Sequence, residues 1–220
     1  MLALTLAALA AIVVSGSLQA ASGPYGQYTA QAATGELVAG SQAGQSFVTD
    51  QPGLYRIDVY LGHYQRPIRG MVRLHVTALP FAGPDLALAT LDAAQVQTDG
   101  FESFEFAPLD EPAGQPLCFW LEAPQAQPDN ALTVIGANSD SYPNGRAFFN
   151  NLPASGGVQD LTFRLYYQPG AGQALATVMQ RLAAGRPAAF GAPQLYAILM
   201  AGYLLGAAAL LALVVSRLHL

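Results

Sequence analysis

An apolar segment without a single charge, LYAILMAGYLLGAAALLALVV, runs from Leu195 to Val215. At about 1.5 Å of rise per residue, a helix of this length spans roughly 30 Å, the thickness of a bilayer's hydrocarbon core. Tyr196 and Arg217 flank the segment and suit the membrane interface. We therefore predict a transmembrane helix over residues 194–216, followed by a short cytoplasmic tail at 217–220.

The N-terminal segment, MLALTLAALAAIVVSGSLQAASG, is shorter in its apolar part. The apolar run ends near Val14, which is the length of a signal-peptide core, and small residues up to Ala20 suit cleavage. The absence of Lys and Arg before this run keeps an uncleaved anchor as the alternative. Residues 1–22 are thus expected to be a signal peptide or signal anchor, and residues 23–34 a linker. Both interpretations predict a cell-membrane protein, single-pass or two-pass, whose middle lies outside the cytoplasm.

The middle of the chain alternates apolar and polar residues, as half-buried strands do. In LYRIDVYL, Tyr55 and Ile57 are expected to face the core, and Arg56 and Asp58 to face away from it. The same alternation occurs in MVRLHV, FESFEF, PLCFWLE and DLTFRLYY, with Gly- and Pro-rich turns such as DQPG, RPIRG and LPFAGPD between the runs. We predict a mainly β fold, an antiparallel jelly-roll β-sandwich over residues 35–168.

Composition changes again after the last of these runs. GQALATVMQRLAAGRP places Leu175, Val178, Met179 and Leu182 at helical spacing, and Gly185 follows as a stop signal. Residues 169–193 are expected to form an amphipathic helix and a linker. This helix would lie on the bilayer surface or pack against the sandwich.

Charge and cysteine content exclude several classes of function. The net charge is −5 and the pI is about 4.9, so no basic stripe exists to neutralise nucleic-acid phosphates. The single cysteine, Cys118, excludes an intramolecular disulfide framework.

Patterns that would indicate catalysis or a metal site are weak. Ser41, in VAGSQAG, lacks the G-x-S-x-G spacing of a nucleophile elbow, and Cys118 lies in an expected strand without a neighbouring cation. His63 and His75, with Asp58 nearby, form only a weak zinc pattern. No spacing singles out a carboxylate pair for glycoside hydrolysis. We therefore expect a non-catalytic protein without a metal cofactor.

The outward faces of the expected strands carry aromatic rings beside charged groups. This combination suits sugar rings, which have an apolar face and a rim of hydroxyls, and it also suits a polar protein interface. A solvated sheet face is the plain alternative. The candidate ligand-binding residues are Arg56, Asp58, Tyr60, Arg73, His75, Trp120, Glu122, Arg164 and Tyr166.

Two further patterns point to binding. NSDSYPNGRAFFNN offers oxygen ligands at Asn138, Asp140 and Asn144, with spacing that loosely resembles a calcium loop, but no downstream Glu completes it. Its Asn-Gly pair favours a two-residue hairpin turn. In the apolar C-terminal segment, Gly202 and Gly206 are four residues apart, as in helices that pack closely against a partner helix.

Several runs carry a family resemblance: GSQAGQSFVTDQPGLYRIDVYLGHY, FWLEAPQAQPDNALTV, and LTFRLYY followed by RLAAGRP and a membrane helix. They are similar to bacterial membrane-anchored extracytoplasmic β-sandwich domains that resemble galactose-binding-like, jelly-roll carbohydrate-binding modules. The resemblance implies an exported β-sandwich with a link to carbohydrate. We expect a non-catalytic, membrane-anchored module that binds glycan or a glycan-bearing partner. The alternative is a structural accessory subunit of a larger membrane complex, held by its C-terminal helix.

Overall fold

The computed structural model describes residues 25–150, 152–153, 157–168, 179–180 and 182–218. The described residues up to Gln168 belong to one compact unit, and those from Met179 onward belong to another. The expected signal peptide or anchor, residues 1–22, and most of the expected amphipathic helix lie outside the described residues.

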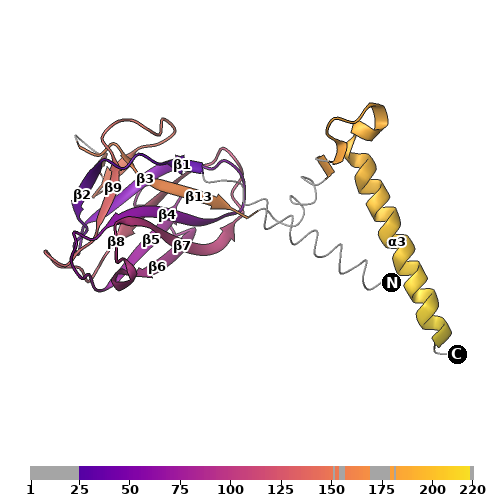
Figure 1. Cartoon of the computed structure of the whole chain (residues 1–220), viewed down its shortest axis with the longest axis horizontal. Coiled ribbons are helices and arrows are strands. Elements are labelled where there is room, and N and C mark those ends of the chain that lie inside the picture. Colours follow the sequence, from indigo (N-terminus) through magenta and orange to yellow (C-terminus); the bar gives the residue numbers. More distant parts are fainter. Residues whose placement is uncertain (1–24, 151, 154–156, 169–178, 181, 219–220) are drawn as a thin grey trace. The chain divides into compact units, whose positions relative to one another are not determined.

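Within the described residues, thirteen strands form two antiparallel sheets (Figure 1). The seven-stranded sheet contains β1 (Tyr25–Gln27), β2 (Ala32–Glu36), β4 (Leu54–Gly62), β7 (Gly100–Leu109), β9 (Thr133–Ala137), β12 (Asp160–Leu161) and β13 (Phe163–Tyr167). The six-stranded sheet contains β3 (Gln42–Val48), β5 (Met71–Thr77), β6 (Ala87–Asp92), β8 (Pro116–Glu122), β10 (Ala147–Phe149) and β11 (Leu152–Pro153). A short 3-10 helix, η1 (Ala93–Gln95), follows β6.

The long strand β4 organises the seven-stranded sheet. It pairs with β13 and, at its end, with β9 on one side, while β7 pairs along the other. The order in the six-stranded sheet is β11-β10-β3-β8-β5-β6. Phe163 of the first sheet contacts Phe47 and Phe119 of the second, with ring centroids 6.4 and 5.4 Å apart. One hydrophobic core therefore joins the two sheets.

The alternation in the sequence predicts the buried faces well. Val72, Leu74 and Val76 on β5 are buried, as are Leu117, Phe119 and Leu121 on β8. The prediction for the start of β4 is wrong, because Leu54 and not Tyr55 takes the core position. The register against β7 shifts between Leu54 and Arg56, so the local bulge displaces Tyr55 from the core face.

The predicted domain boundary also requires correction, because the residues expected to form a linker contain strands. β1 pairs with β13 through Tyr25 and Leu165, and β2 pairs with β9. Both segments complete the backbone hydrogen bonds of strands that would otherwise lie at an edge of the sheet. Their short length and small residues hide the alternating pattern that reveals the other strands.

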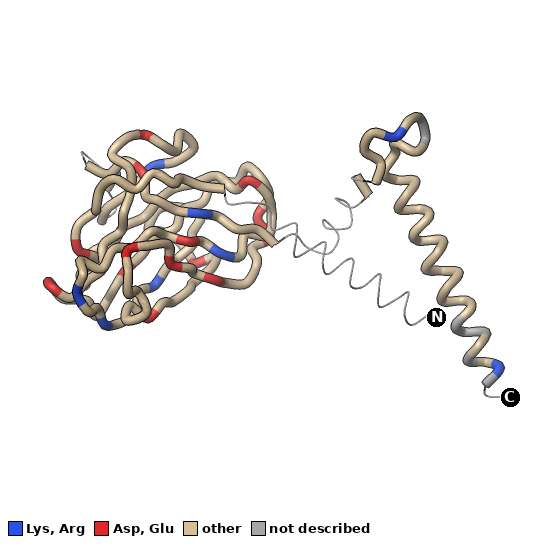
Figure 2. Tube along the Cα trace, viewed as in Figure 1, with Lys and Arg blue, Asp and Glu red and all other residues tan. Residues whose placement is uncertain are grey.

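The C-terminal unit contains η2 (Ala188–Gly191) and the helix α3 (Pro193–Leu218). α3 agrees closely with the predicted span of 194–216, and its first residue is a proline, which helices favour at that position. Among the described helices, α3 is long and apolar enough to cross a membrane. Figure 2 shows charged residues distributed over the sandwich, whereas the sequence from Pro193 to Ser216 contains no charged residue.

Candidate functional site

The predicted ligand-binding residues do not form one site, because they lie on two different sheets. Five belong to the seven-stranded sheet: Arg56, Asp58, Tyr60, Arg164 and Tyr166. Four belong to the six-stranded sheet: Arg73, His75, Trp120 and Glu122. Each group is brought together by cross-strand pairing on its own sheet.

On the seven-stranded sheet, the charged groups are paired with one another. Arg56 donates two hydrogen bonds to the buried carboxylate of Asp58, at 2.6 and 2.9 Å, and its guanidinium lies 4.5 Å from the centre of the Tyr166 ring. A bidentate pair of this kind is among the stronger ionic contacts in proteins. Burial, and then the charge of Asp58, raises the pKa of Glu102 on the neighbouring strand β7.

Arg164 lies on the same face, and its guanidinium contacts two aromatic rings. Its guanidinium carbon is 3.6 Å from the centre of the Phe101 ring and 5.5 Å from that of Tyr28. Tyr60 meets Phe101 edge to face at 5.2 Å. Cation–π contacts of this type offset part of the cost of removing the guanidinium from water. The residues on this face thus stabilise one another and leave few groups unengaged.

The six-stranded sheet carries a row of cross-strand partners, which are Phe148, Gly44, Trp120, His75 and Leu88 on successive strands from β10 to β6. The His75 and Trp120 rings are parallel, with centroids 3.8 Å apart. Because each ring covers the face of the other, that shared surface is not free for a sugar.

A loop residue fills the gap in this row at Gly44. Phe81, from the connection between β5 and β6, lies 5.7 Å from the Trp120 ring, and a Cβ added at Gly44 would come within 3.1 Å of the Phe81 ring. Asp85, from the same connection, lies 3.0 Å from Nδ1 of His75. The β5–β6 loop therefore covers part of this row of cross-strand partners on the outer face of the sheet.

The remaining charges of this group are also paired. Arg73 donates to Glu122 at 3.2 Å, and Oε1 of Glu122 lies 3.6 Å from Nε2 of His75. His63 and His75, which form a weak zinc pattern in the sequence, bond to different carboxylates, those of Asp99 and Asp85. Cys118 is buried, and burial raises the pKa of its thiol to about 12.

The calcium candidates Asn138, Asp140 and Asn144 are exposed. Their loop is held from below by the buried carboxylate of Asp160, which accepts hydrogen bonds from the backbone N–H of Ser141 at 2.8 Å and of Tyr142 at 3.0 Å. In the described part of the chain, no group of three or more His, Cys, Asp or Glu side chains could hold a metal ion.

The turn in this loop differs from the predicted one. The N–H of Gly145 donates to the carbonyl of Tyr142, so Pro143 and Asn144 occupy the centre of the turn. The flanking strands β9 and β10 belong to different sheets and do not form a hairpin. Gly145 is required for a different reason, because a Cβ there would lie 1.8 Å from the carbonyl oxygen of Ser46.

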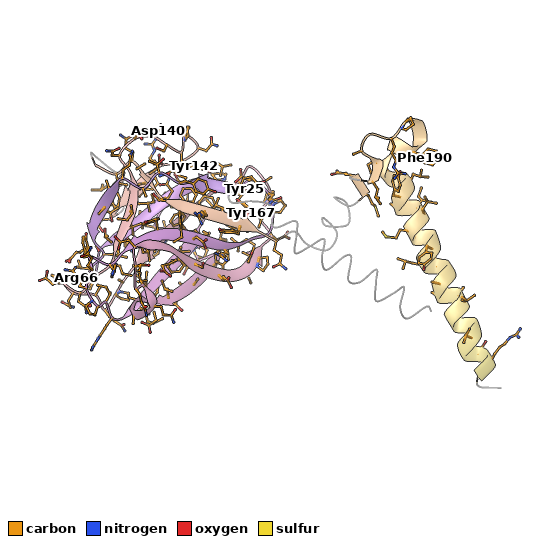
Figure 3. The ribbon with its side chains drawn as sticks, in the orientation of Figure 1. Tyr25, Arg66, Asp140, Tyr142, Tyr167 and Phe190 are labelled. Carbon is orange, nitrogen blue, oxygen red and sulfur yellow. The ribbon has the colours of Figure 1, made fainter. Side chains whose placement is uncertain are left out.

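An open depression of about 440 Å³ lies where the β4–β5 loop meets the segment after β6. Its lining comprises His63, Gln65, Arg66, Pro67, Ile68, Arg69, Ala94, Val96 and Gln97. The labelled Arg66 lies at the end of the sandwich away from Tyr25 and Tyr167 (Figure 3). None of these residues is among the nine predicted ligand-binding residues, and His63 occurs only in the weak zinc pattern.

Carboxylates outside the lining hold two of its side chains in place. Arg66 forms ion pairs with Glu36 and Asp129. Asp99 accepts hydrogen bonds from the backbone N–H of His63 at 2.9 Å and from its Nδ1 at 2.7 Å. These two bonds, the backbone one first, lower the pKa of Asp99. The side chains that line the depression are therefore oriented by a second layer of residues.

The backbone of this loop is unusual. Tyr64 and Gln65 have φ angles of 52° and 56°, in the left-handed region that non-glycine residues rarely adopt. Strained conformations of this kind cluster at functional sites. The Tyr64 ring is 44% exposed, and the Arg66 guanidinium lies 5.0 Å from its centre. The turn signal RPIRG marks a loop here, but nothing in its letters indicates a cavity.

Neither a comparison with protein-family models nor one with curated proteins gives a match for this chain.

Proposed function

We propose that this chain is a non-catalytic, membrane-anchored module that binds glycan in the depression between the β4–β5 loop and η1. The depression carries this proposal, because it combines an apolar floor with oriented hydrogen-bonding groups beside an exposed aromatic ring. The two predicted outer-face groups are less suitable, since their charged side chains are already paired with one another.

The chemistry of the lining suits a sugar. The exposed Pro67 supplies apolar surface for the C–H face of a pyranose ring, and the buried Ile68 and Val96 complete the apolar part of the lining. Gln65 and Gln97 supply amide donors and acceptors for hydroxyls. The Tyr64 ring beside the depression adds an exposed aromatic surface. Loops held at one end of a rigid sandwich are common positions for binding residues.

The location of the depression fits a tethered binding module. The last described strand of the sandwich, β13, ends at Tyr167, and Arg66 of the depression lies at the end of the sandwich away from Tyr167 (Figure 3). The chain passes from one sheet to the other, for example from β9 to β10, which supports the jelly-roll description. The resemblance to bacterial membrane-anchored extracytoplasmic domains supports a location outside the cytoplasm.

Binding of the full-length chain in detergent or nanodiscs to an oligosaccharide array tests this proposal. Tyr64→Asn removes the ring and keeps a residue that tolerates the left-handed backbone. We expect affinity for the best glycan to fall about threefold to tenfold. Tyr28→Asn is the matched control, because Tyr28 is a similarly exposed tyrosine, also beside an arginine, outside the depression. Equal binding by the two variants, or no glycan bound at all, would contradict the proposal.

A structural accessory subunit is the second candidate, and α3 is the observation that favours it. At Gly202 and Gly206, an added Cβ would meet no atom of the described residues within 4 Å, which would allow another helix to approach closely on this side. Replacing both glycines with Leu should reduce the size of the complex purified from the native membrane. Ala208→Leu, on another side of α3, should leave that size unchanged.

A further inference from the structure

We propose that the glycan bound in the depression is acidic, and that Arg69 binds its anionic group. This inference rests on the proposed function and specifies the class of ligand. The shared chemistry is an oxyanion attached to a sugar, either the carboxylate of a uronic acid or a sulfate ester.

The lining of the depression has a charge opposite to that of the whole chain. The chain has a net charge of −5, with 14 acidic residues against nine arginines. Nevertheless, the lining contains two arginines and a histidine and no Asp or Glu. A surface that served only to remain hydrated would be expected to share the acidic character of the rest.

Acidic residues near the depression are engaged with groups around it. Glu36 pairs with Arg66 and also accepts from the backbone N–H of Asp129 at 3.2 Å. Asp99 is occupied by two hydrogen bonds from His63. These carboxylates hold the side chains that face the ligand and are not themselves part of the lining. A ligand anion would therefore meet donors and not a carboxylate.

Arg69 differs from its neighbour Arg66 in having no counter-charge. Its side chain is exposed and forms no ion pair with any residue that the structure describes. Its backbone is fixed by a hydrogen bond from its N–H to Asn130 at 3.2 Å. An unpaired guanidinium on a held loop can donate two parallel hydrogen bonds to an oxyanion.

Arg66, on the same loop, does not provide a second free cation. Glu36 and Asp129 pair with its guanidinium, and its Nε is buried, with almost no surface that a ligand oxygen could reach. Arg69 is therefore the arginine of the lining that is available to an anion.

Three oligosaccharides of equal length test the inference on the full-length chain: a hexuronate tetrasaccharide, the same compound after carboxyl reduction, and a sulfated neutral tetrasaccharide. We expect at least one acidic probe to bind roughly 10- to 100-fold more tightly than the reduced one. Whichever acidic probe binds identifies the oxyanion. Arg69→Gln should remove the difference, Arg69→Lys should restore part of it, and added salt should weaken binding of the acidic probe.

Arg73→Gln is the matched control, because Arg73 is an exposed arginine on the six-stranded sheet, outside the depression. It should leave the preference for the acidic probe unchanged. Equal binding of all three probes, or a preference that survives in Arg69→Gln, would overturn the inference. If binding of the reduced probe still required Tyr64 in that case, the proposed glycan binding would stand and only the inference of an acidic ligand would fail. If no probe bound, both would fail.

Discussion

Asp160→Asn is the substitution whose effect on stability follows most directly from the structure. Asp160 is buried, and its carboxylate accepts three hydrogen bonds. Its Oδ2 accepts hydrogen bonds from the backbone N–H groups of Ser141 and Tyr142, and its Oδ1 accepts one from Nε2 of Gln45 at 3.0 Å. The carboxylate thus joins the 138–145 loop to a strand of each sheet.

An asparagine cannot reproduce these contacts. Its single carbonyl oxygen can accept from the two backbone groups, but its NH₂ then meets the NH₂ of Gln45, and both are donors. Gln45 cannot turn over to relieve this, because its Oε1 already accepts from the N–H of Leu161 at 2.8 Å. One hydrogen bond to a charged acceptor is lost and a buried donor is left unpaired, at a cost of about 2–3 kcal/mol.

Urea unfolding of the full-length chain, followed by far-UV circular dichroism, measures this loss. A melting temperature lower by about 4–10 °C should accompany it in a domain of this size. Asp140→Asn is the control, since Asp140 is an exposed acid in the same loop and should change stability by less than about 0.5 kcal/mol. If Asp160→Asn were as stable as Asp140→Asn, the assigned role of the buried carboxylate would be wrong.

Four further outcomes are expected. Cys118 should not react with a thiol reagent in the folded protein at pH 8, because its pKa is raised to about 12, and it should react on unfolding. The contribution of this thiol to stability should be lost as the pH rises above about 9, because the thiol ionises there in the unfolded chain but not in the folded protein. Phe163→Ala should lower the free energy of unfolding by about 3–5 kcal/mol in urea titrations, because the ring is buried between both sheets. Gly145→Ala should destabilise the protein in the same titrations by more than 1 kcal/mol, roughly the usual effect of a single substitution, since the added methyl group overlaps a backbone oxygen. A chelator should leave the thermal melt unchanged, since hydrogen bonds to Asp160 hold the loop of the calcium candidates; a lower melting temperature would indicate calcium as a ligand there.

The sequence predicts the strands that alternate clearly and have one buried face. β5 and β8 are examples, because each places three aliphatic or aromatic residues of one face in the core. It fails at β1 and β2, whose residues, such as Gly26 and Thr34, carry no period-two signal. These strands exist because β13 and β9 provide backbone partners, and that information is not local. The bulge at Tyr55 depends in the same way on the neighbouring strand.

Residue type alone does not show whether a predicted binding group in this chain is free or paired. The predicted arginines and aromatic rings are present on outer faces, but Arg56 has Asp58, Arg73 has Glu122, and Trp120 has His75. Such pairs satisfy the groups that would otherwise attract a ligand. Whether a cation is paired depends on strand register and loop closure, and alternation along one strand cannot reveal either.

In the depression, the fold gives two similar loop residues different surroundings. Arg66 and Arg69 lie in one short turn signal and look equivalent in the sequence. The fold brings Glu36 and Asp129 to Arg66 from distant parts of the chain and brings no carboxylate to Arg69 among the described residues. Two similar side chains, three residues apart, thus receive different tasks: Arg66 is held in place, and Arg69 remains available to an anion. The contrast between Arg69→Gln and Arg73→Gln is therefore a direct test of whether an unpaired cation, and not cationic charge in general, determines what this surface binds.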